Sequence, residues 1–278
     1  MGRMHSAFRR GAILSDRTEG ASLNPVRLMN DMRPSALPPI AGYHPTTMID
    51  WPGRLAAIVF LPRCNLRCPF CHAGPLLADP VETIPPQGIL EHIASRGGWI
   101  DGVVICGGEP TLWESLPALC ETFRRAGLAV KLDTNGTRPE CLADLVEAGL
   151  LQAVAMDLKA PPDERYHEAC GTTVDLDAVG RSIDFLMAGR VEYEFRTTLG
   201  PACVGEDEIR AMGPRIAGAR RWVLQRFEPA GALDPALRTV RPYDLPTMES
   251  LAEIGRQYVA SCLLRGQPNT QPVSSGEK

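Results

Sequence analysis

Three cysteines in a short segment are the residues of this sequence best suited to inorganic chemistry. Cys64, Cys68 and Cys71 fall within eight residues at the spacing Cys-x3-Cys-x2-Cys, whereas the other six of the nine cysteines stand apart. This spacing could place three small side chains on one face of a core helix. However, Pro62 and Pro69 lie in the same segment, and proline inside a helix costs about 3 kcal/mol. We therefore expect a loop whose thiolates point inward onto a metal centre.

Two kinds of centre fit such a loop. Zinc would take His72 as a fourth ligand, although structural zinc usually draws its cysteines from two separated pairs. A 4Fe-4S cluster usually has four cysteine ligands, so three ligands would leave one iron with an open position. That iron could chelate a small molecule through an amine and a carboxylate, and a cluster of low potential could give it an electron. The spacing favours the cluster over zinc, and the six isolated cysteines are expected to be small buried side chains.

The composition is that of an ordinary globular protein. The chain has 278 residues, 44% of them hydrophobic and 22% charged, with a net charge of −4, which excludes a disordered chain, a collagen and a coiled coil. The mild acidic balance gives no reason to expect nucleic acid as a partner. The longest apolar run, Leu55 to Leu61, is far shorter than the roughly 20 residues of a membrane helix, and no signal-peptide core stands near Met1. We expect a cytoplasmic protein that binds no membrane.

Short apolar runs alternate with stretches of helical spacing, which is typical of successive βα units and a parallel sheet. Helical spacing is clearest over 116–123, 142–146, 179–187, 209–216 and 251–258. Six units over about 225 residues are fewer than the eight units of a closed barrel, which takes about 250 residues. We predict an α/β fold with an open, partial (β/α)6 TIM-like barrel over 41–265, a mobile extension over 1–40 and a disordered tail over 266–278. The six strands are predicted to begin near Leu55, Gly102, Ala129, Ala153, Val191 and Arg221.

Parallel βα folds carry their chemistry at the carboxyl ends of the strands, and each predicted end here holds polar residues or glycine. After the cysteine segment come Gly107-Gly108-Glu109-Pro110, Asp133-Thr134-Asn135-Gly136, Asp157-Leu158-Lys159, Arg196-Thr197-Thr198 and Gln225-Arg226-Phe227-Glu228.

Each of these ends has a structural and a functional interpretation. The glycine pair could form only a tight turn, or it could let a ligand lie against bare backbone. Asp133, Asp157 and Lys159 could form only an ion pair, which for exposed groups contributes about 0 to 1 kcal/mol. Arg196 lies in an otherwise apolar strand and needs an anionic partner. A ligand carboxylate and Asp157 are both candidates for that partner.

The segment RCNLRCPFCH at 63–72 resembles the cluster loop of radical S-adenosylmethionine (SAM) enzymes, in particular the activating enzymes of glycyl-radical enzymes. Residues 107–110 resemble the second motif of that superfamily. Four further segments together resemble the activating proteins of anaerobic ribonucleoside-triphosphate reductase: TTMIDWPG at 46–53, KLDTNG at 131–136, MDLK at 156–159 and YEFRTT at 193–198. The similarity runs from about Gly42 to Pro235.

The resemblance implies that Cys64, Cys68 and Cys71 hold a 4Fe-4S cluster that reductively cleaves SAM to a 5′-deoxyadenosyl radical. The Gly107-Gly108 backbone would receive the methionine amino group, and Lys159 would contact the methionine carboxylate. Asp133, the carbonyl of Thr134 and Asp157 would bind a monovalent cation, whereas Glu109 would either join the site or only fix the turn. The complete set of implied cofactor-binding residues is Phe70, Gly107, Gly108, Glu109, Asp133, Asp157, Lys159, Arg196 and Gln225.

The same resemblance implies a protein substrate. The radical would abstract hydrogen from a glycine Cα of anaerobic ribonucleotide reductase, presented as a loop at the open side of the barrel. A flavodoxin- or ferredoxin-type protein would supply the electron. The alternatives are an activase of pyruvate formate-lyase or another glycyl-radical enzyme, a radical SAM enzyme acting on a small molecule, and a non-catalytic zinc or Fe-S scaffold. Arg63 stands where a small residue is common, and Ala73-Gly74 replace the usual Asn, which leaves the partner open.

Overall fold

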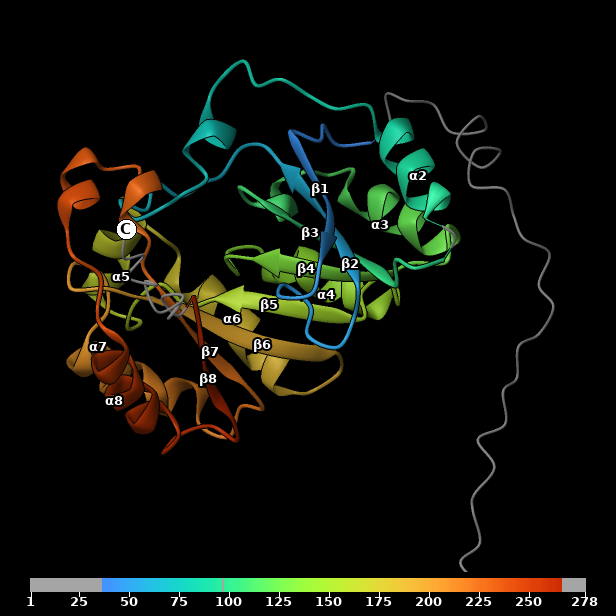
Figure 1. Ribbon diagram of the computed structural model, residues 1–278. Coiled ribbons are helices and arrows are strands. Elements are labelled where there is room, and N and C mark those ends of the chain that lie inside the picture. The colour runs from blue at the N-terminus through green and yellow to red at the C-terminus, as the bar shows by residue number, and fades with distance from the viewer. Residues whose placement is uncertain (1–36, 97, 267–278) are drawn as a thin grey trace, which may run out of the picture.

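A single eight-stranded sheet runs through the computed structural model, which describes residues 37–96 and 98–266 (Figure 1). The predicted extension therefore lies outside the described residues up to residue 36, and the predicted tail lies outside them from residue 267. The strands are β1 (Gly42–Thr47), β2 (Ala56–Leu61), β3 (Gly102–Gly107), β4 (Ala129–Thr134), β5 (Ala153–Asp157), β6 (Glu192–Leu199), β7 (Trp222–Arg226) and β8 (Cys262–Arg265).

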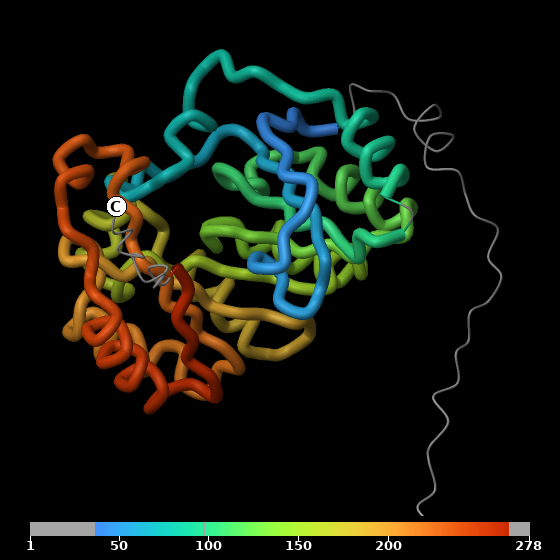
Figure 2. The backbone as a smooth tube through the Cα atoms, in the orientation of Figure 1, coloured from blue at the N-terminus to red at the C-terminus, as the bar shows by residue number. Residues whose placement is uncertain are grey.

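The strands are hydrogen-bonded in sequence order, from β1 to β8. Strand β1 is antiparallel to β2, and all later neighbours are parallel. Strands β1 and β8 are the two edges of this ladder, and Figure 2 shows the chain curving between them without closing. The partial barrel of mixed α/β type is confirmed, and its six predicted strands begin within one residue of the expected positions. Strands β1 and β8 were not predicted.

Helices cover the outer face of the curved sheet (Figure 1). They are α2 (Pro86–Ser95), α3 (Leu116–Arg125), α4 (Pro139–Glu147), α5 (Glu164–Cys170), α6 (Leu176–Met187), α7 (Glu206–Met212) and α8 (Leu245–Gly255). Short 3-10 turns are η2 (Gly74–Leu77), η3 (Pro110–Leu112), η4 (Gly213–Ile216), η5 (Pro229–Gly231) and η6 (Pro235–Thr239). The predicted helical face of α3 is buried, but the extension of the last helix to Tyr258 is wrong. Helix α8 ends at Gly255, and the Tyr258 carbonyl instead accepts a hydrogen bond from Gly218 N at 2.8 Å.

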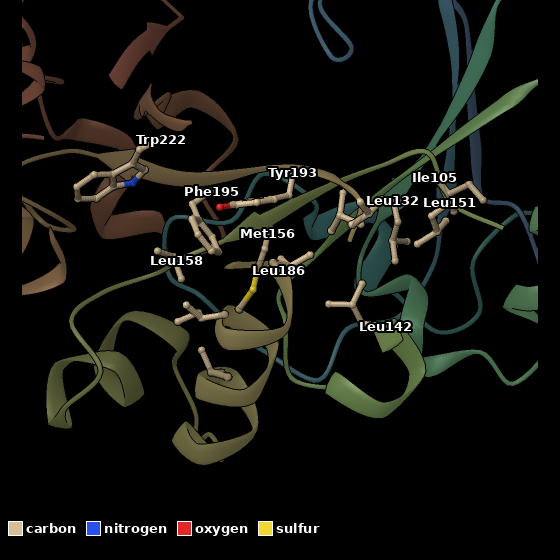
Figure 3. Packing of buried hydrophobic residues seen from close by; sticks show 14 of the residues in the cluster. Ile105, Leu132, Leu142, Leu151, Met156, Leu158, Leu186, Tyr193, Phe195 and Trp222 are labelled. Carbon is tan, nitrogen blue, oxygen red and sulfur yellow. The ribbon is translucent and has the colours of Figure 1, made fainter. Parts of the chain in front are cut away.

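Along β4 and β6, side chains on one face of the sheet are apolar and side chains on the other face are charged. Leu132 of β4 and Phe195 of β6 belong to the buried cluster that includes Leu142 and Leu186 of the surrounding helices (Figure 3). Successive strand residues point to opposite faces, so the neighbours of Leu132 and Phe195 point into the barrel. These inward neighbours are charged: Lys131, Asp133, Glu194 and Arg196, all buried. In the part of the chain that the structure describes, no helix is long and apolar enough to cross a membrane.

Candidate active site

A cavity of about 570 Å³ opens at the carboxyl ends of the strands. The three clustered cysteines line it, together with eight of the nine predicted cofactor residues: Phe70, Gly107, Gly108, Asp133, Asp157, Lys159, Arg196 and Gln225. Glu109 is the exception. The parallel sheet therefore brings together residues that lie more than 150 positions apart in the sequence.

The cysteine segment is an irregular loop after β2, as its prolines predict. Backbone N–H groups of Leu66 and Ala73 donate to the sulfurs of Cys64 and Cys71 at 3.4 and 3.3 Å. Burial raises the pKa of the Cys64 thiol to about 11 and also raises the pKa of Cys71. A thiolate ligand therefore needs cationic compensation at these positions, which a metal centre provides.

The donor set fits a cluster better than one metal ion. Within the described ranges, no three His, Cys, Asp or Glu side chains converge closely enough to hold a single ion, yet three soft thiol ligands line one cavity. His72, the fourth ligand of the zinc alternative, also lines this cavity, but it is exposed and its ring packs 6.2 Å from the ring of Phe227.

Two glycines allow the loops after β2 and β3 to pack against each other. A Cβ on Gly108 would lie 1.8 Å from the Arg63 carbonyl oxygen, and one on Gly107 would lie 2.3 Å from the Leu61 oxygen. Gly107 also has a φ of 119°, which disfavours other residues. The pair is thus required for close backbone packing, and it leaves bare backbone on the cavity wall.

Arg63 lies directly before the first cysteine. Among the non-glycine residues that the structure describes, it is the one with a left-handed backbone, at φ 69°. Its N–H donates to Leu76 O at 3.0 Å, and its carbonyl accepts from Glu109 N at 2.8 Å. Its guanidinium lies 5.1 Å from the centre of the Trp113 ring. These contacts hold a conformation that costs about 1–3 kcal/mol.

Glu109 is fully buried and is not among the residues that line the cavity. Its carboxylate accepts hydrogen bonds from Thr111 N and Oγ1, from Thr134 Oγ1 at 2.8 Å and from Asn135 N at 2.6 Å. Burial raises its pKa, although these donors oppose the shift. Of the two roles considered for Glu109, the contacts support fixing the turn, because they join the end of β3 to the end of β4.

An ion-pair network lines the inner wall of the cavity. Arg196 Nη1 lies 2.6 Å from Asp133 Oδ2, and Arg196 Nε lies 2.9 Å from Asp157 Oδ1. Lys159 Nζ donates to Asp157 Oδ2 at 2.9 Å. Burial opposes ionisation of Asp157, but Arg196 and Lys159 outweigh it and hold its pKa at about 2. Asp157 is therefore a partner of Arg196, one of the two candidates from sequence.

The predicted monovalent cation does not fit this network. Three of the four oxygens of Asp133 and Asp157 already contact Arg196 or Lys159. The fourth, Asp133 Oδ1, is buried without a hydrogen-bond partner, and it lies 3.7 Å from Lys131 Nζ. Of the predicted ligand oxygens, this leaves the Thr134 carbonyl and one carboxylate oxygen that faces an ammonium, whereas potassium and sodium ions need several oxygen ligands.

Sequence reasoning missed two polar contacts of the cysteine loop. Asn135 lines the cavity, and its Nδ2 donates to Asn65 Oδ1 at 2.9 Å and lies 3.9 Å from the sulfur of Cys64. The buried Cys170 thiol hydrogen-bonds to Cys68 and lowers the pKa of Cys68 to about 7. The position of Asn135 at a strand end was a usable signal, whereas nothing in the sequence connects Cys170 with Cys68.

The segment between β7 and α8 covers the cysteine loop and was also missed. Asp234 N donates to Pro69 O at 2.9 Å, and a Cβ on Gly231 would lie 3.6 Å from the His72 ring. The loop is thus held between residues from both halves of the chain.

Comparison with known proteins agrees with this geometry. The chain is 29% identical over 233 residues to a "Putative glycyl-radical enzyme activating enzyme" of Methanocaldococcus jannaschii, covering 81% of this chain and 95% of that protein. It is 33% identical over 168 residues to a "Probable GTP 3',8-cyclase" of Pyrococcus abyssi, covering 59% and 53% of the two chains. The fold matches Streptococcus suis SuiB bound to the precursor peptide SuiA with a TM-score of 0.58 at 14% identity, over 73% of this chain and 46% of that one. The family described as "Radical SAM superfamily" matches residues 58–202, and the chain therefore belongs to the radical SAM superfamily.

Proposed function

We propose that this radical SAM enzyme generates a glycyl radical on a partner enzyme, and that the partner is anaerobic ribonucleoside-triphosphate reductase. The observation that carries the proposal is the cavity in which three thiols, bare glycine backbone and two cationic side chains meet. Family membership implies a 4Fe-4S cluster and SAM. Bound there, they supply a one-electron reductive cleavage that yields a 5′-deoxyadenosyl radical.

The protein residues bind and orient these groups. Cys64, Cys68 and Cys71 would ligate the cluster, and the backbone of Gly107 and Gly108 would accept the methionine amino group. Lys159 would face the methionine carboxylate, and Arg196 on the same wall would hold Asp157, the ion-pair partner of Lys159. Phe70, whose ring centre lies 6.0 Å from Lys159 Nζ, and Gln225 of β7 would complete the wall around the cofactor.

The proposal of a glycyl-radical substrate draws support from two sources. The relative from Methanocaldococcus jannaschii aligns over most of both chains. The sheet also has separate edges at β1 and β8, which would give a loop of a partner protein a way toward the cavity. The four segments at 46–53, 131–136, 156–159 and 193–198 favour the ribonucleotide reductase over other glycyl-radical enzymes. A flavodoxin- or ferredoxin-type protein would donate the electron.

Anaerobic reconstitution with iron and sulfide tests the first part. The wild type should bind about four iron and four sulfide and form 5′-deoxyadenosine from SAM under dithionite. Cys64→Ala, Cys68→Ala and Cys71→Ala should each abolish this cleavage and keep the fold. Cys141→Ala is the matched control, because Cys141 is a half-buried cysteine of α4 outside the cavity. Full cleavage in any of the three variants contradicts the ligand assignment.

Electron paramagnetic resonance tests the target. The reconstituted protein is mixed with SAM, reductant and either anaerobic ribonucleotide reductase or pyruvate formate-lyase. We expect a glycyl-radical signal with the reductase only. Cleavage of SAM with a signal on pyruvate formate-lyase alone, or on neither enzyme, would reject the reductase as the target while leaving the cofactor chemistry standing.

A further inference from the structure

Three adjacent strands each contribute one charged residue to a compact unit in the barrel wall. Asp133 is the second-last residue of β4, Asp157 ends β5 and Arg196 lies on β6, in register with Asp157. The guanidinium lies between the two carboxylates, with one nitrogen 2.6 Å from Asp133 and another 2.9 Å from Asp157. Because a guanidinium is planar and carries donors in a fixed fork, it can bridge two carboxylates in one defined geometry.

This arrangement leaves the two carboxylates with a single oxygen, Asp133 Oδ1, that has no hydrogen-bond partner among the described residues. Asp157 uses both oxygens, one on Arg196 and the other on Lys159. Asp133 uses Oδ2 on Arg196, and its Oδ1 faces Lys131 at 3.7 Å. A monovalent cation would have to break one of the short ion pairs before it gained two carboxylate ligands.

The charge balance also opposes a further cation. Lys131, Lys159 and Arg196 surround the two carboxylates, while Glu194 accepts from Lys131 at 3.1 Å at the far side. Arg265 lies 3.5 Å from that same glutamate, and Arg221 lies 3.6 Å from it. The described network therefore carries more basic than acidic groups. A sodium or potassium ion would therefore be repelled by this network, whereas an anionic group in the cavity would be attracted.

We propose that the Arg196 guanidinium takes the place of a bound monovalent cation in this protein, so that the wall of the site is assembled without sodium or potassium. Arg196 is thus a positioning residue that joins β4, β5 and β6 and sets where Lys159 stands. Only the role of this wall in holding SAM rests on the proposed function. The ion pairs themselves are formed by protein residues alone and need neither cluster nor SAM.

Thermal unfolding of the protein without cluster or SAM tests this. The unfolding midpoint is measured in sodium, potassium and N-methyl-glucamine chloride at equal ionic strength, and specific binding is followed by the ²³Na line width. A ligand that binds only the folded state raises the midpoint. We expect the wild type to have the same midpoint in all three salts and no protein-specific sodium broadening.

The Arg196→Gln variant should gain the cation dependence that the wild type lacks. It leaves the buried Asp133 carboxylate and the half-buried Asp157 carboxylate without the guanidinium between them. Its midpoint should therefore fall in N-methyl-glucamine and recover in part in sodium or potassium, with broadening of the sodium signal. Arg221→Gln is the matched control, since Arg221 is an arginine of the same network that touches neither Asp133 nor Asp157, and it should show no salt preference. If Arg196→Gln does not fold, Arg196→Lys takes its place, because one ammonium lacks the fork that bridges both carboxylates.

Two outcomes would overturn the proposal. One is a wild-type midpoint that rises specifically with sodium or potassium. The other is a folded Arg196 variant that gains no cation dependence. Neither depends on cluster assembly or SAM cleavage, so a failure here is distinguishable from a failure of the proposed function.

Discussion

Replacing Gly108 by alanine should displace the cysteine loop. The new methyl carbon would lie 1.8 Å from the Arg63 oxygen and 2.5 Å from the Arg63 carbonyl carbon, whereas carbon contacts normally begin at about 3.5 Å. The Arg63 carbonyl must therefore move by more than about 1 Å, which breaks its hydrogen bond from Glu109 N. The lost bond costs about 0.5–1.5 kcal/mol, and overpacking adds about 1–3 kcal/mol. We expect the free energy of unfolding to fall by about 2–4 kcal/mol.

Urea unfolding of the reduced protein without cluster measures this change, and iron content after reconstitution reports whether the loop still holds a cluster. Gly88→Ala is the matched control. Gly88 lies in α2 with nothing within 4 Å of an added Cβ and an ordinary backbone angle. Alanine there should stabilise by up to about 1 kcal/mol. Equal stability and equal iron content in the two variants would refute the account of the glycine pair.

Three further predictions concern neighbouring residues. Arg63→Gly should be more stable to urea than Arg63→Ala by about 1 kcal/mol, because both lose the contact with Trp113 but only alanine keeps the left-handed strain; the reverse order would mean that Arg63 is unstrained. The pKa of Asp157 is about 2 in the folded protein, below the unfolded value near 3.9, so its stabilisation is present above pH 5 and is lost as the pH falls toward 2. Asp157→Asn should therefore flatten the loss of stability over that range, by about 2 kcal/mol, and an unchanged pH profile would contradict the ion pairs. Lys159→Ala should weaken SAM binding in a titration of the reconstituted protein while the iron content stays unchanged, and loss of iron instead would show a structural role in the cysteine loop.

The strands that the sequence predicts are those buried on both faces. Segments such as Val103–Ile105 and Val154–Met156 are continuous apolar runs of the kind that parallel sheets need. Strand β1 escaped prediction because it contains Gly42, His44 and Pro45 and is paired only at an edge. Strand β8 has four residues and follows α8 after a short turn, too short a run for periodicity to identify.

The sequence alone could predict which residues gather in the site, because that depends only on the topology of the sheet. Parallel strands place their carboxyl ends together, so Asp133, Asp157 and Arg196 could be assigned to one cavity before any contact was known. Which charge pairs with which could not be assigned, because it depends on side-chain geometry across three strands. The burial of Glu109 was equally hidden. Two of its four hydrogen bonds come from Thr111 in the following turn, and the other two come from Thr134 and Asn135, which only the fold brings close.

The segment that covers the cysteine loop has a consequence for biosynthesis. The hydrogen bond from Asp234 to Pro69 joins residues about 165 positions apart, and chains grow at about 5–20 residues per second. After the three cysteines have been synthesised, roughly 10 to 30 s therefore pass before the ribosome has made the segment that packs against their loop. Under the proposed ligand assignment, iron and sulfide would reach these thiols in that interval, before the segment between β7 and α8 packs against the cysteine loop.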